Sequence, residues 1–262
     1  ALGGCGPEAG ASSCDAMEGA WSWEGFADAF AAAARRAGFR GTEIAETAAG
    51  PLMAWEKPGN GKRVYLSGGM HGDEPAGPLA LLKLLDEGFF TGPADWTICP
   101  ALNPTGLAAG TRENAEGIDL NRDYFTRRSA EAAAHAGWLL GRPVPDLFLS
   151  LHEDWETSGF YFYEINLTED KPQRARAILE AVAPWFPAES GADIDGHEPR
   201  GPGWIFHAAK ADIPEGWPEA IYLADLGCPL SFTLETPSKA DIGARVAAHG
   251  AAVRAACAAS EC

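Results

Sequence analysis

Basic side chains and long apolar runs are both scarce in this chain of 262 residues. Lys and Arg number 20 against 37 Asp and Glu, which gives a formal net charge of −17. Binding to nucleic acid or to an anionic membrane surface needs clustered positive charge, so the composition argues against both as partners. No apolar stretch approaches the roughly 20 residues that a transmembrane helix requires, so no membrane-spanning segment is expected.

Cysteine pairs of the Cys-x-x-Cys type are also missing, which argues against a cysteine-based zinc site. Cys99 and Cys228 lie in or beside apolar strand candidates and are expected to be buried thiols. The even number of cysteines near the chain ends is compatible with terminal disulfides and a periplasmic or secreted protein. Free thiols in a cytoplasmic enzyme are an equally open interpretation. The cysteines near the ends are Cys5, Cys14, Cys257 and Cys262.

The remaining composition is that of a globular protein. Hydrophobic residues make up 46% and charged residues 22%, and no long polar tract interrupts them, so a sizeable core can form. Residues 1–20 are rich in Gly, Ala and Ser and are expected to form a loose N-terminal arm. Residues 21–262 are expected to form a single domain.

Apolar periodicity and turn residues predict alternating helices and strands along this domain. Helices are expected at residues 24–36, 75–85, 129–140, 171–183 and 242–258. Strands are expected at residues 42–46, 52–56, 64–66, 96–99, 147–151, 160–164 and 230–234, and mostly loop at 103–124 and 184–220. This alternation predicts an α/β fold with a mixed, mostly parallel sheet and helices on both faces.

Polar residues suited to catalysis follow three of the apolar strand candidates. Residues 64–66 lead through a glycine turn to His71 and Glu74, and the other two strands run into His152 and Glu235. The carboxyl ends of parallel strands meet at one edge of a sheet, where ligands bind. A charged group at the end of a buried strand is partly desolvated and needs a partner. We therefore expect these four side chains to lie close together.

His71, Glu74 and His152 have the chemistry of a metal site. A turn that opens a helix can direct His71 and Glu74, three positions apart, at one point. Two histidines and one glutamate form the ligand set of many catalytic zinc sites, with the fourth position left for water. Each residue alone is more often structural, as a histidine in a glycine turn or in a core. From these residues alone, a structural role for each histidine stays open beside a site for one zinc ion.

Longer strings around these residues resemble the zinc carboxypeptidase family, the carboxypeptidase A/B-like metallopeptidases. Residues 69–74 (GMHGDE) resemble its first zinc motif, and residues 150–152 (SLH) resemble the strand that supplies its third ligand. Residues 117–122 (GIDLNR) resemble its Asn-Arg substrate clamp, and residues 232–235 (FTLE) resemble the strand that ends in its catalytic glutamate. The order of the segments, over residues 62–236, is that of the family.

The resemblance implies a zinc carboxypeptidase-like catalytic domain and a role for each matching residue. His71, Glu74 and His152 would hold the zinc ion. Glu235 would take a proton from the attacking water and pass it to the leaving amine. Arg112 resembles the arginine that stabilises the negative charge on the scissile carbonyl.

Substrate recognition is implied for three further residues. Asn121 and Arg122 would bind the terminal carboxylate of a substrate, which a guanidinium can grip with two parallel hydrogen bonds. The family also places a tyrosine near the substrate. Tyr222 is the candidate here, with Tyr161 and Tyr163 as competitors.

Three functions follow for a substrate with a free carboxylate. The leading one is a carboxypeptidase acting on a short peptide, and residues 112–122 look closest to bacterial members that trim cell-wall peptides. The second is an N-acyl amino acid deacylase similar to aspartoacylase and succinylglutamate desuccinylase. These typically follow the third ligand with a hydroxyl-rich turn, whereas residues 153–155 are Glu-Asp-Trp. The third is a non-catalytic zinc- and peptide-binding module, which would have no need of Glu235 or Arg112. Side-chain preference and oligomeric state are not predicted.

Overall fold

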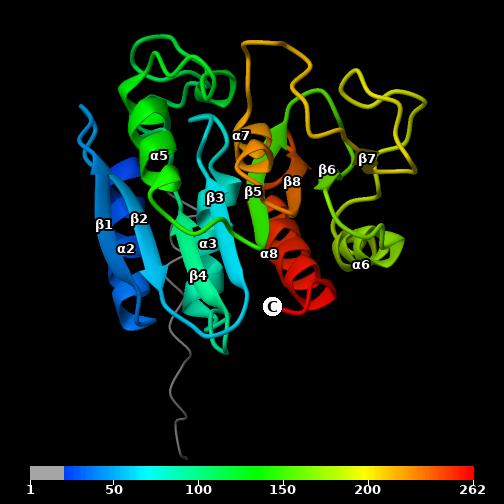
Figure 1. Ribbon diagram of the computed structural model, residues 1–262, viewed down its shortest axis with the longest axis horizontal. Coiled ribbons are helices and arrows are strands. Elements are labelled where there is room, and N and C mark those ends of the chain that lie inside the picture. Colours follow the sequence, from blue (N-terminus) through cyan, green and yellow to red (C-terminus); the bar gives the residue numbers. More distant parts are fainter. Residues whose placement is uncertain (1–20) are drawn as a thin grey trace, which may run out of the picture.

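A computed structural model describes residues 21–262 as one α/β domain. The loose arm expected at residues 1–20 lies outside this range. The described part contains an eight-stranded sheet with the order β1-β2-β4-β3-β5-β8-β6-β7 (Figure 1). Its strands are β1 (Arg40–Ala45), β2 (Leu52–Lys57), β3 (Arg63–Gly68), β4 (Asp95–Cys99), β5 (Leu147–Asp154), β6 (Tyr161–Asn166), β7 (Trp204–Phe206) and β8 (Leu230–Pro237).

The centre of this sheet is parallel. Strand β3 pairs in parallel with both β4 and β5, and β5 pairs in parallel with β8. Strand β2 is antiparallel to β4, and β6 is antiparallel to β8. The prediction of a mixed, mostly parallel sheet is confirmed. Since β3, β5 and β8 run the same way, their carboxyl ends share one edge, which lies uppermost in Figure 1.

Helices cover both faces of the sheet, as predicted. Helices α2, α3, α6 and α8 pack on one face, and α5 and α7 pack on the other. The bounds are α2 (Trp23–Arg36), α3 (Ala76–Asp86), α4 (Pro104–Ala109), η1 (a 3-10 turn, Leu120–Arg122), α5 (Ala130–Leu140), α6 (Pro172–Val182), α7 (Glu219–Asp225) and α8 (Ile242–Ala259).

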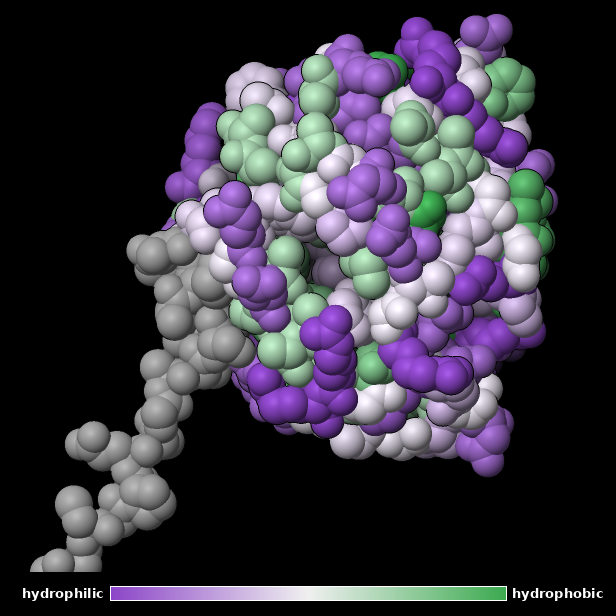
Figure 2. All heavy atoms as spheres, turned by 90° about the vertical axis from the view of Figure 1, so that its left-hand side faces the viewer, coloured by the Kyte–Doolittle hydropathy of each residue, from purple (hydrophilic) through white to green (hydrophobic). Residues whose placement is uncertain are grey.

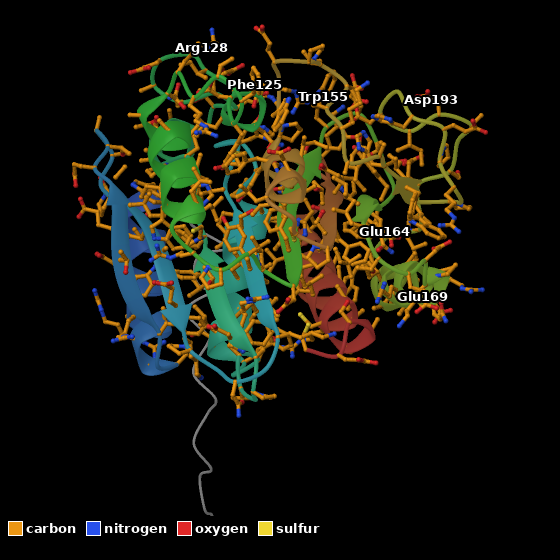
Figure 3. The ribbon with its side chains drawn as sticks, viewed as in Figure 1. Phe125, Arg128, Trp155, Glu164, Glu169 and Asp193 are labelled. Atoms are coloured by element: carbon orange, nitrogen blue, oxygen red, sulfur yellow. The ribbon has the colours of Figure 1, made fainter. Side chains whose placement is uncertain are left out.

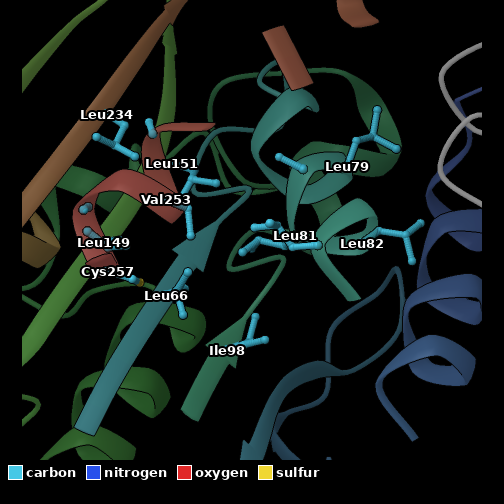
Figure 4. Close-up of a cluster of buried hydrophobic side chains, with 14 of the residues drawn as sticks. Leu66, Leu79, Leu81, Leu82, Ile98, Leu149, Leu151, Leu234, Val253 and Cys257 are labelled. Atoms are coloured by element: carbon cyan, nitrogen blue, oxygen red, sulfur yellow. The ribbon is translucent and has the colours of Figure 1, made fainter. Parts of the chain in front are cut away.

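The larger core lies between the central strands and helices α3 and α8 (Figure 4). Leu66, Leu149 and Leu234 extend from β3, β5 and β8 towards Leu81 of α3 and Val253 of α8, and all are buried. Burying one such side chain contributes about 1.5–3 kcal/mol relative to leaving it exposed. The core therefore holds the three strands that end at the candidate site in fixed register.

Two of the predicted loops contain short elements. Residues 103–124, expected to be loop, include α4 and η1, and residues 184–220 include β7 and the start of α7. Asn103 begins α4, because its side chain accepts a hydrogen bond from the Gly106 amide at 2.9 Å. None of these elements exceeds seven residues, which is too short to establish a helical or alternating pattern.

The outer strand β1 is polar and irregular. Arg40 and Glu43 are exposed on it, and its register with β2 shifts between Glu43 and Ala45. Charges and a bulge on an edge strand discourage pairing with another chain. On the side where β1 and α2 lie, hydrophilic and hydrophobic side chains are interspersed (Figure 2). Within residues 21–262, no helix has the length and apolar character that crossing a membrane would need.

The cysteines of the described range are all free thiols. Cys99 and Cys228 are buried as predicted, and burial raises the pKa of the Cys228 thiol to about 12. Cys257 and Cys262 carry no disulfide, so the expected terminal disulfides are not seen between residues 21 and 262. Cys5 and Cys14 lie outside the described residues.

Candidate metal centre and substrate cavity

The three predicted metal ligands come together at the carboxyl edge of the sheet. His71 and Glu74 follow β3, and His152 lies on β5. Nδ1 of His71 is 2.6 Å from Oε1 of Glu74, and Nδ1 of His152 is 3.0 Å from Oε2 of the same carboxylate. The ligand atoms all lie within 4.8 Å of one another, and the three side chains are buried. The two ring nitrogens and the carboxylate can thus reach one common point.

Electrostatics at this point favour a cation. Burial by itself would raise the pKa of Glu74, but the imidazoles of His71 and His152 bring it well below its ordinary value. Burial also opposes protonation of His71, yet Glu74 and Asp119 raise its pKa to about 9. The carboxylates of Glu74 and Asp119 therefore stabilise positive charge at this point, where burial lowers the local dielectric constant. Two imidazoles and a carboxylate beside an open cavity fit the donor set of a catalytic zinc site.

The turn before the ligands depends on close backbone contacts. Gly69 has φ +60°, a conformation that favours glycine. A Cβ on Gly72 would lie 1.8 Å from the backbone carbonyl carbon of Gly106 in α4. Asn103, which begins α4, also donates a hydrogen bond to the Arg112 carbonyl at 3.2 Å. The turn that carries His71 is therefore packed directly against α4, which fixes its position.

Asp119 links the ligand set to Arg112, a role that sequence reasoning did not assign. Nε2 of His71 lies 3.2 Å from Oδ1 of Asp119, which leaves Nδ1 facing Glu74. Nε and Nη2 of Arg112 donate to Oδ2 of Asp119 at 3.2 and 3.0 Å. The remaining Nη1 lies 3.3 Å from Nδ1 of His71. Asp119 therefore orients both a ligand and the arginine beside it. Asp119 lies two residues before Asn121, and this position was the sequence signal that could have identified its role.

Asn121 and Arg122 lie on η1 and line the same cavity. The Asn121 amide N–H donates to Oδ1 of Asp119 at 2.9 Å. Its side-chain Oδ1 accepts a hydrogen bond from the Glu219 amide at the start of α7, at 3.0 Å. Because the oxygen of this side chain is engaged, its NH₂ group is the part available to a ligand. Nη1 of Arg122 donates to the Asn121 carbonyl at 2.9 Å.

Glu235 lines the cavity from β8. It is in register with His152 on one side and with Tyr161 on the other. Burial raises the pKa of Glu235 well above its ordinary value, and the nearby carboxylates of Glu74 and Asp154 add to this effect. The sequence-based expectation that Glu235 lies on the same edge as His152 agrees with this register.

The structure corrects the assignment of Tyr222. Its ring is buried in α7 against Tyr124, and its hydroxyl donates to the Ala136 carbonyl at 3.0 Å. Tyr222 therefore packs α7 against α5 and does not reach the cavity. Tyr161 and Tyr163, on β6, do line it. The sequence could not show which tyrosine lines the cavity, because this depends on the residues that pack against each ring in the folded protein.

A buried polar network below η1 was also missed. The Tyr124 hydroxyl donates to Nδ1 of His135 at 2.7 Å, and Nε2 of His135 lies 3.0 Å from the Tyr65 hydroxyl. The hydroxyls of Tyr65 and Ser67 both donate to the Glu219 carboxylate at 2.7 Å. Burial raises the pKa of Glu219 to about 7. This network fixes Glu219, whose amide holds Asn121.

The cavity has a volume of about 360 Å³ and an acidic lining. Among the described residues, its lining includes two arginines, Arg112 and Arg122, and a larger number of carboxylates. Trp155, 64% exposed, stands on the loop after β5 at the upper edge in Figure 3. The lining carboxylates other than Glu74 are those of Glu153, Asp154, Glu156, Asp195, Asp212 and Glu235.

Comparison with known proteins agrees with this geometry. Residues 60–184 match the succinylglutamate desuccinylase/aspartoacylase catalytic domain family. Carboxypeptidase 2 of Trichophyton tonsurans is 32% identical over 109 residues, which cover 37% of this chain and 20% of that protein. The chain thus matches about a fifth of the length of this curated relative.

Solved structures share the fold over most of the chain. A "putative metallopeptidase" from Shewanella amazonensis SB2B has a TM-score of 0.79 and 25% identity, with coverage of 94% of this chain and 93% of that one. A metallo-carboxypeptidase from Burkholderia cenocepacia has a TM-score of 0.66 and 21% identity, with coverage of 89% and 67%. The chain therefore shares its fold with these metallopeptidase structures, and residues 60–184 resemble the succinylglutamate desuccinylase/aspartoacylase catalytic domain.

Proposed function

We propose that this protein is a zinc-dependent carboxypeptidase that hydrolyses the C-terminal amide bond of a short peptide. One observation carries the proposal: the His71–Glu74–His152 cluster, Glu235 and the Asn121–Arg122 pair all line one cavity. A carboxylate bound by Asn121 and Arg122 would place the adjacent amide bond of a peptide towards the His–Glu–His cluster.

Each residue around that bond has a distinct task. A zinc ion held by His71, Glu74 and His152 would polarise the carbonyl and lower the pKa of water. Arg112 is oriented by Asp119 with Nη1 towards the cluster, where it stabilises negative charge on the carbonyl oxygen. Glu235 accepts the proton of the attacking water and returns it to the leaving amine.

The carboxylate clamp gives a first prediction. Arg122→Ala should weaken hydrolysis of free-acid substrates far more than that of their C-terminal amides, because only the acid offers a carboxylate to the guanidinium. The lost charged hydrogen bonds correspond to about 1.5–3 kcal/mol each. Steady-state kcat/KM on matched acid and amide peptides measures the difference. The control is Arg128→Ala, because the Arg128 side chain is 72% exposed and is not part of the cavity lining. Equal losses for acid and amide would exclude this role.

The Asp119 link gives a second prediction. Asp119→Asn should lower zinc affinity by about 10–100-fold, because the group that orients His71 through Nε2 and holds Arg112 loses its charge. Competition with a chromogenic chelator measures the dissociation constant. Asp170→Asn serves as control, since Asp170 pairs with Arg200 on the surface. Unchanged affinity in Asp119→Asn would show that Asp119 does not support the ligand.

A second candidate is an N-acyl amino acid deacylase, and the match of residues 60–184 to the desuccinylase and aspartoacylase domain favours it. The acidic lining argues the other way, because acylated acidic amino acids would bring two carboxylates into a cavity with two arginines and several carboxylates. Asp154 and Asp195 instead suit a substrate that carries an amine. A cell-wall peptide containing a diamino acid offers both a carboxylate and an amine.

The experiment that tests the function compares substrates directly. Purified protein is incubated with a peptide library that includes cell-wall peptides, and in parallel with N-acetylated and N-succinylated amino acids, with and without chelator. Chelator-sensitive release of single C-terminal residues supports the carboxypeptidase. Release of acyl groups only would identify the protein as a deacylase and contradict the proposal. Zinc and peptide binding without any hydrolysis would identify a binding module.

A further inference from the structure

A second group of potential metal ligands lies in the cavity wall, away from the His71 cluster. His197, His207 and Asp212 each offer one ligand atom, and these atoms lie within 4.8 Å of one another. Nε2 of His207 is 3.1 Å and Nε2 of His197 is 3.8 Å from the same Oδ2 of Asp212. The two imidazoles are neighbours, with ring centroids 5.1 Å apart. Both imidazoles therefore point at one carboxylate oxygen.

The contacts of His207 leave room for a cation at this point. Nδ1 of His207 is 2.6 Å from the Ala208 carbonyl oxygen, which can only accept, so Nδ1 carries a hydrogen. In a neutral ring, Nε2 then presents a lone pair to the Asp212 carboxylate, which also only accepts. Such a pairing requires either a second ring proton or a metal ion between the two atoms. A backbone carbonyl that fixes the far nitrogen is the usual partner of a metal-binding histidine.

Distances in the cluster suit a small transition-metal ion. Ligand bonds of 2.0–2.1 Å in a tetrahedral zinc site place neighbouring ligand atoms about 3.3 Å apart. The observed 3.1 and 3.8 Å lie on either side of this value, so small side-chain rotations complete the site. We propose that His197, His207 and Asp212 bind a second divalent transition-metal ion, of the zinc class that imidazole and carboxylate ligands prefer.

The two histidines are held in place by backbone pairing. The His207 amide donates to the Glu164 carbonyl of β6 at 2.8 Å. His197 exchanges two backbone hydrogen bonds with Ile194, at 2.9 and 3.0 Å. The ring of Tyr163 packs edge-on against both imidazoles. Two of the three ligands are therefore pre-oriented on the β6–β7 side of the cavity.

Asp212, by contrast, is on the loop between β7 and α7, and its side chain is 66% exposed. A metal ion would tie this loop to the β6–β7 edge. A Cβ added to Gly216, four residues on, would lie 3.5 Å from Cδ of Arg122, so the same loop borders the proposed carboxylate clamp. The second ion would thus shape the part of the cavity wall that this loop forms. Its ligands do not overlap with those of the first site.

Metal stoichiometry tests the proposal. Chelator-stripped protein is titrated with Zn²⁺ by calorimetry, and bound zinc is counted after dialysis. Wild type should bind two ions, and His207→Ala and Asp212→Asn should each bind one. In a His71→Ala/His152→Ala protein one ion should remain, and adding His207→Ala should remove it. Zinc should also slow hydrogen exchange at residues 208–217 in the double variant, a readout independent of activity.

Matched controls separate this site from the first one and from misfolding. Glu215→Ala removes an exposed carboxylate on the same loop and should retain two ions. Asp212→Asn, at an exposed position, should keep the wild-type melting temperature in chelator. Identical stoichiometry in wild type, His207→Ala and Asp212→Asn would overturn the proposal, whatever happens to the His71 site. A loss of one ion on Asp212→Asn would support it even if the proposed peptidase activity failed.

Discussion

Glu235→Gln is expected to lower turnover by about 10²-fold or more while the protein stays folded and keeps its zinc. Glutamine preserves the size of the side chain and removes the group that accepts a proton. Glu235 lies on β8 in register with His152, and the three proposed ligands do not include it. Burial and the carboxylates of Glu74 and Asp154 raise the pKa of Glu235, which suits donation of a proton to the leaving amine, whereas acceptance of a proton would need the positive charge of a bound zinc ion nearby.

Zinc content, melting temperature and turnover should be measured on one preparation of Glu235→Gln. Glu156→Gln is the matched control, because Glu156 lines the cavity but follows the end of β5 instead of facing His152 in the sheet. If Glu235 only held the end of its strand, the variant would melt earlier and lose little rate per folded molecule. Near-normal turnover in a folded, zinc-loaded Glu235→Gln protein would exclude the proton-transfer role.

Arg112→Ala is expected to reduce kcat by about 10²–10³-fold, the usual effect of removing one donor to a developing oxyanion. The structure supports this because Asp119 engages Nε and Nη2, so that Nη1 is the nitrogen left facing the His71–Glu74 pair. Arg112→Lys should not restore the rate, since an ammonium group cannot keep the two bonds to Asp119 and reach the substrate as well.

The comparison with Arg122→Ala makes this test specific. Removing Arg112 should slow free-acid and amide substrates to a similar degree, whereas removing Arg122 should affect the acids selectively. Zinc content must be measured in parallel, because Arg112 also contacts the group that orients His71. A rise in KM without a change in kcat would assign Arg112 to substrate binding and not to charge stabilisation.

The strands and the convergence of their ends could be predicted from the sequence because they depend on local patterns. Apolar runs before His152 and Glu235 indicated buried strands, and the alternation with helices indicated a mostly parallel sheet. Parallel strands then place their carboxyl ends together, as β3, β5 and β8 do. The hydrophobic periodicity and the order of the elements were therefore sufficient to predict that the strand ends converge.

Other parts of the site depend on contacts between residues far apart in the chain. The Glu219 amide holds Asn121 across 98 positions, and no local pattern connects them. Tyr222 was the predicted candidate, with Tyr161 and Tyr163 as competitors, and only the burial of its ring against Tyr124 excluded it. His197 and His207 are ten positions apart, in a region with little periodicity, and the turn closed by the Gly201–Trp204 bridge lies between them and returns the chain.

The place of β8 in the sheet has a consequence for the order in which the protein can assemble during synthesis. This strand, the last in the described chain, lies between β5 and β6, which are made much earlier. Until β8 emerges, β5 and β6 each present an unpaired edge, and such edges are sites of mispairing between chains. The cavity closes only when β8 inserts and brings Glu235 beside His152. A nascent chain therefore carries the proposed metal ligands before it carries the proposed proton acceptor, and the proposed hydrolytic activity should arise only when synthesis of the sheet is complete.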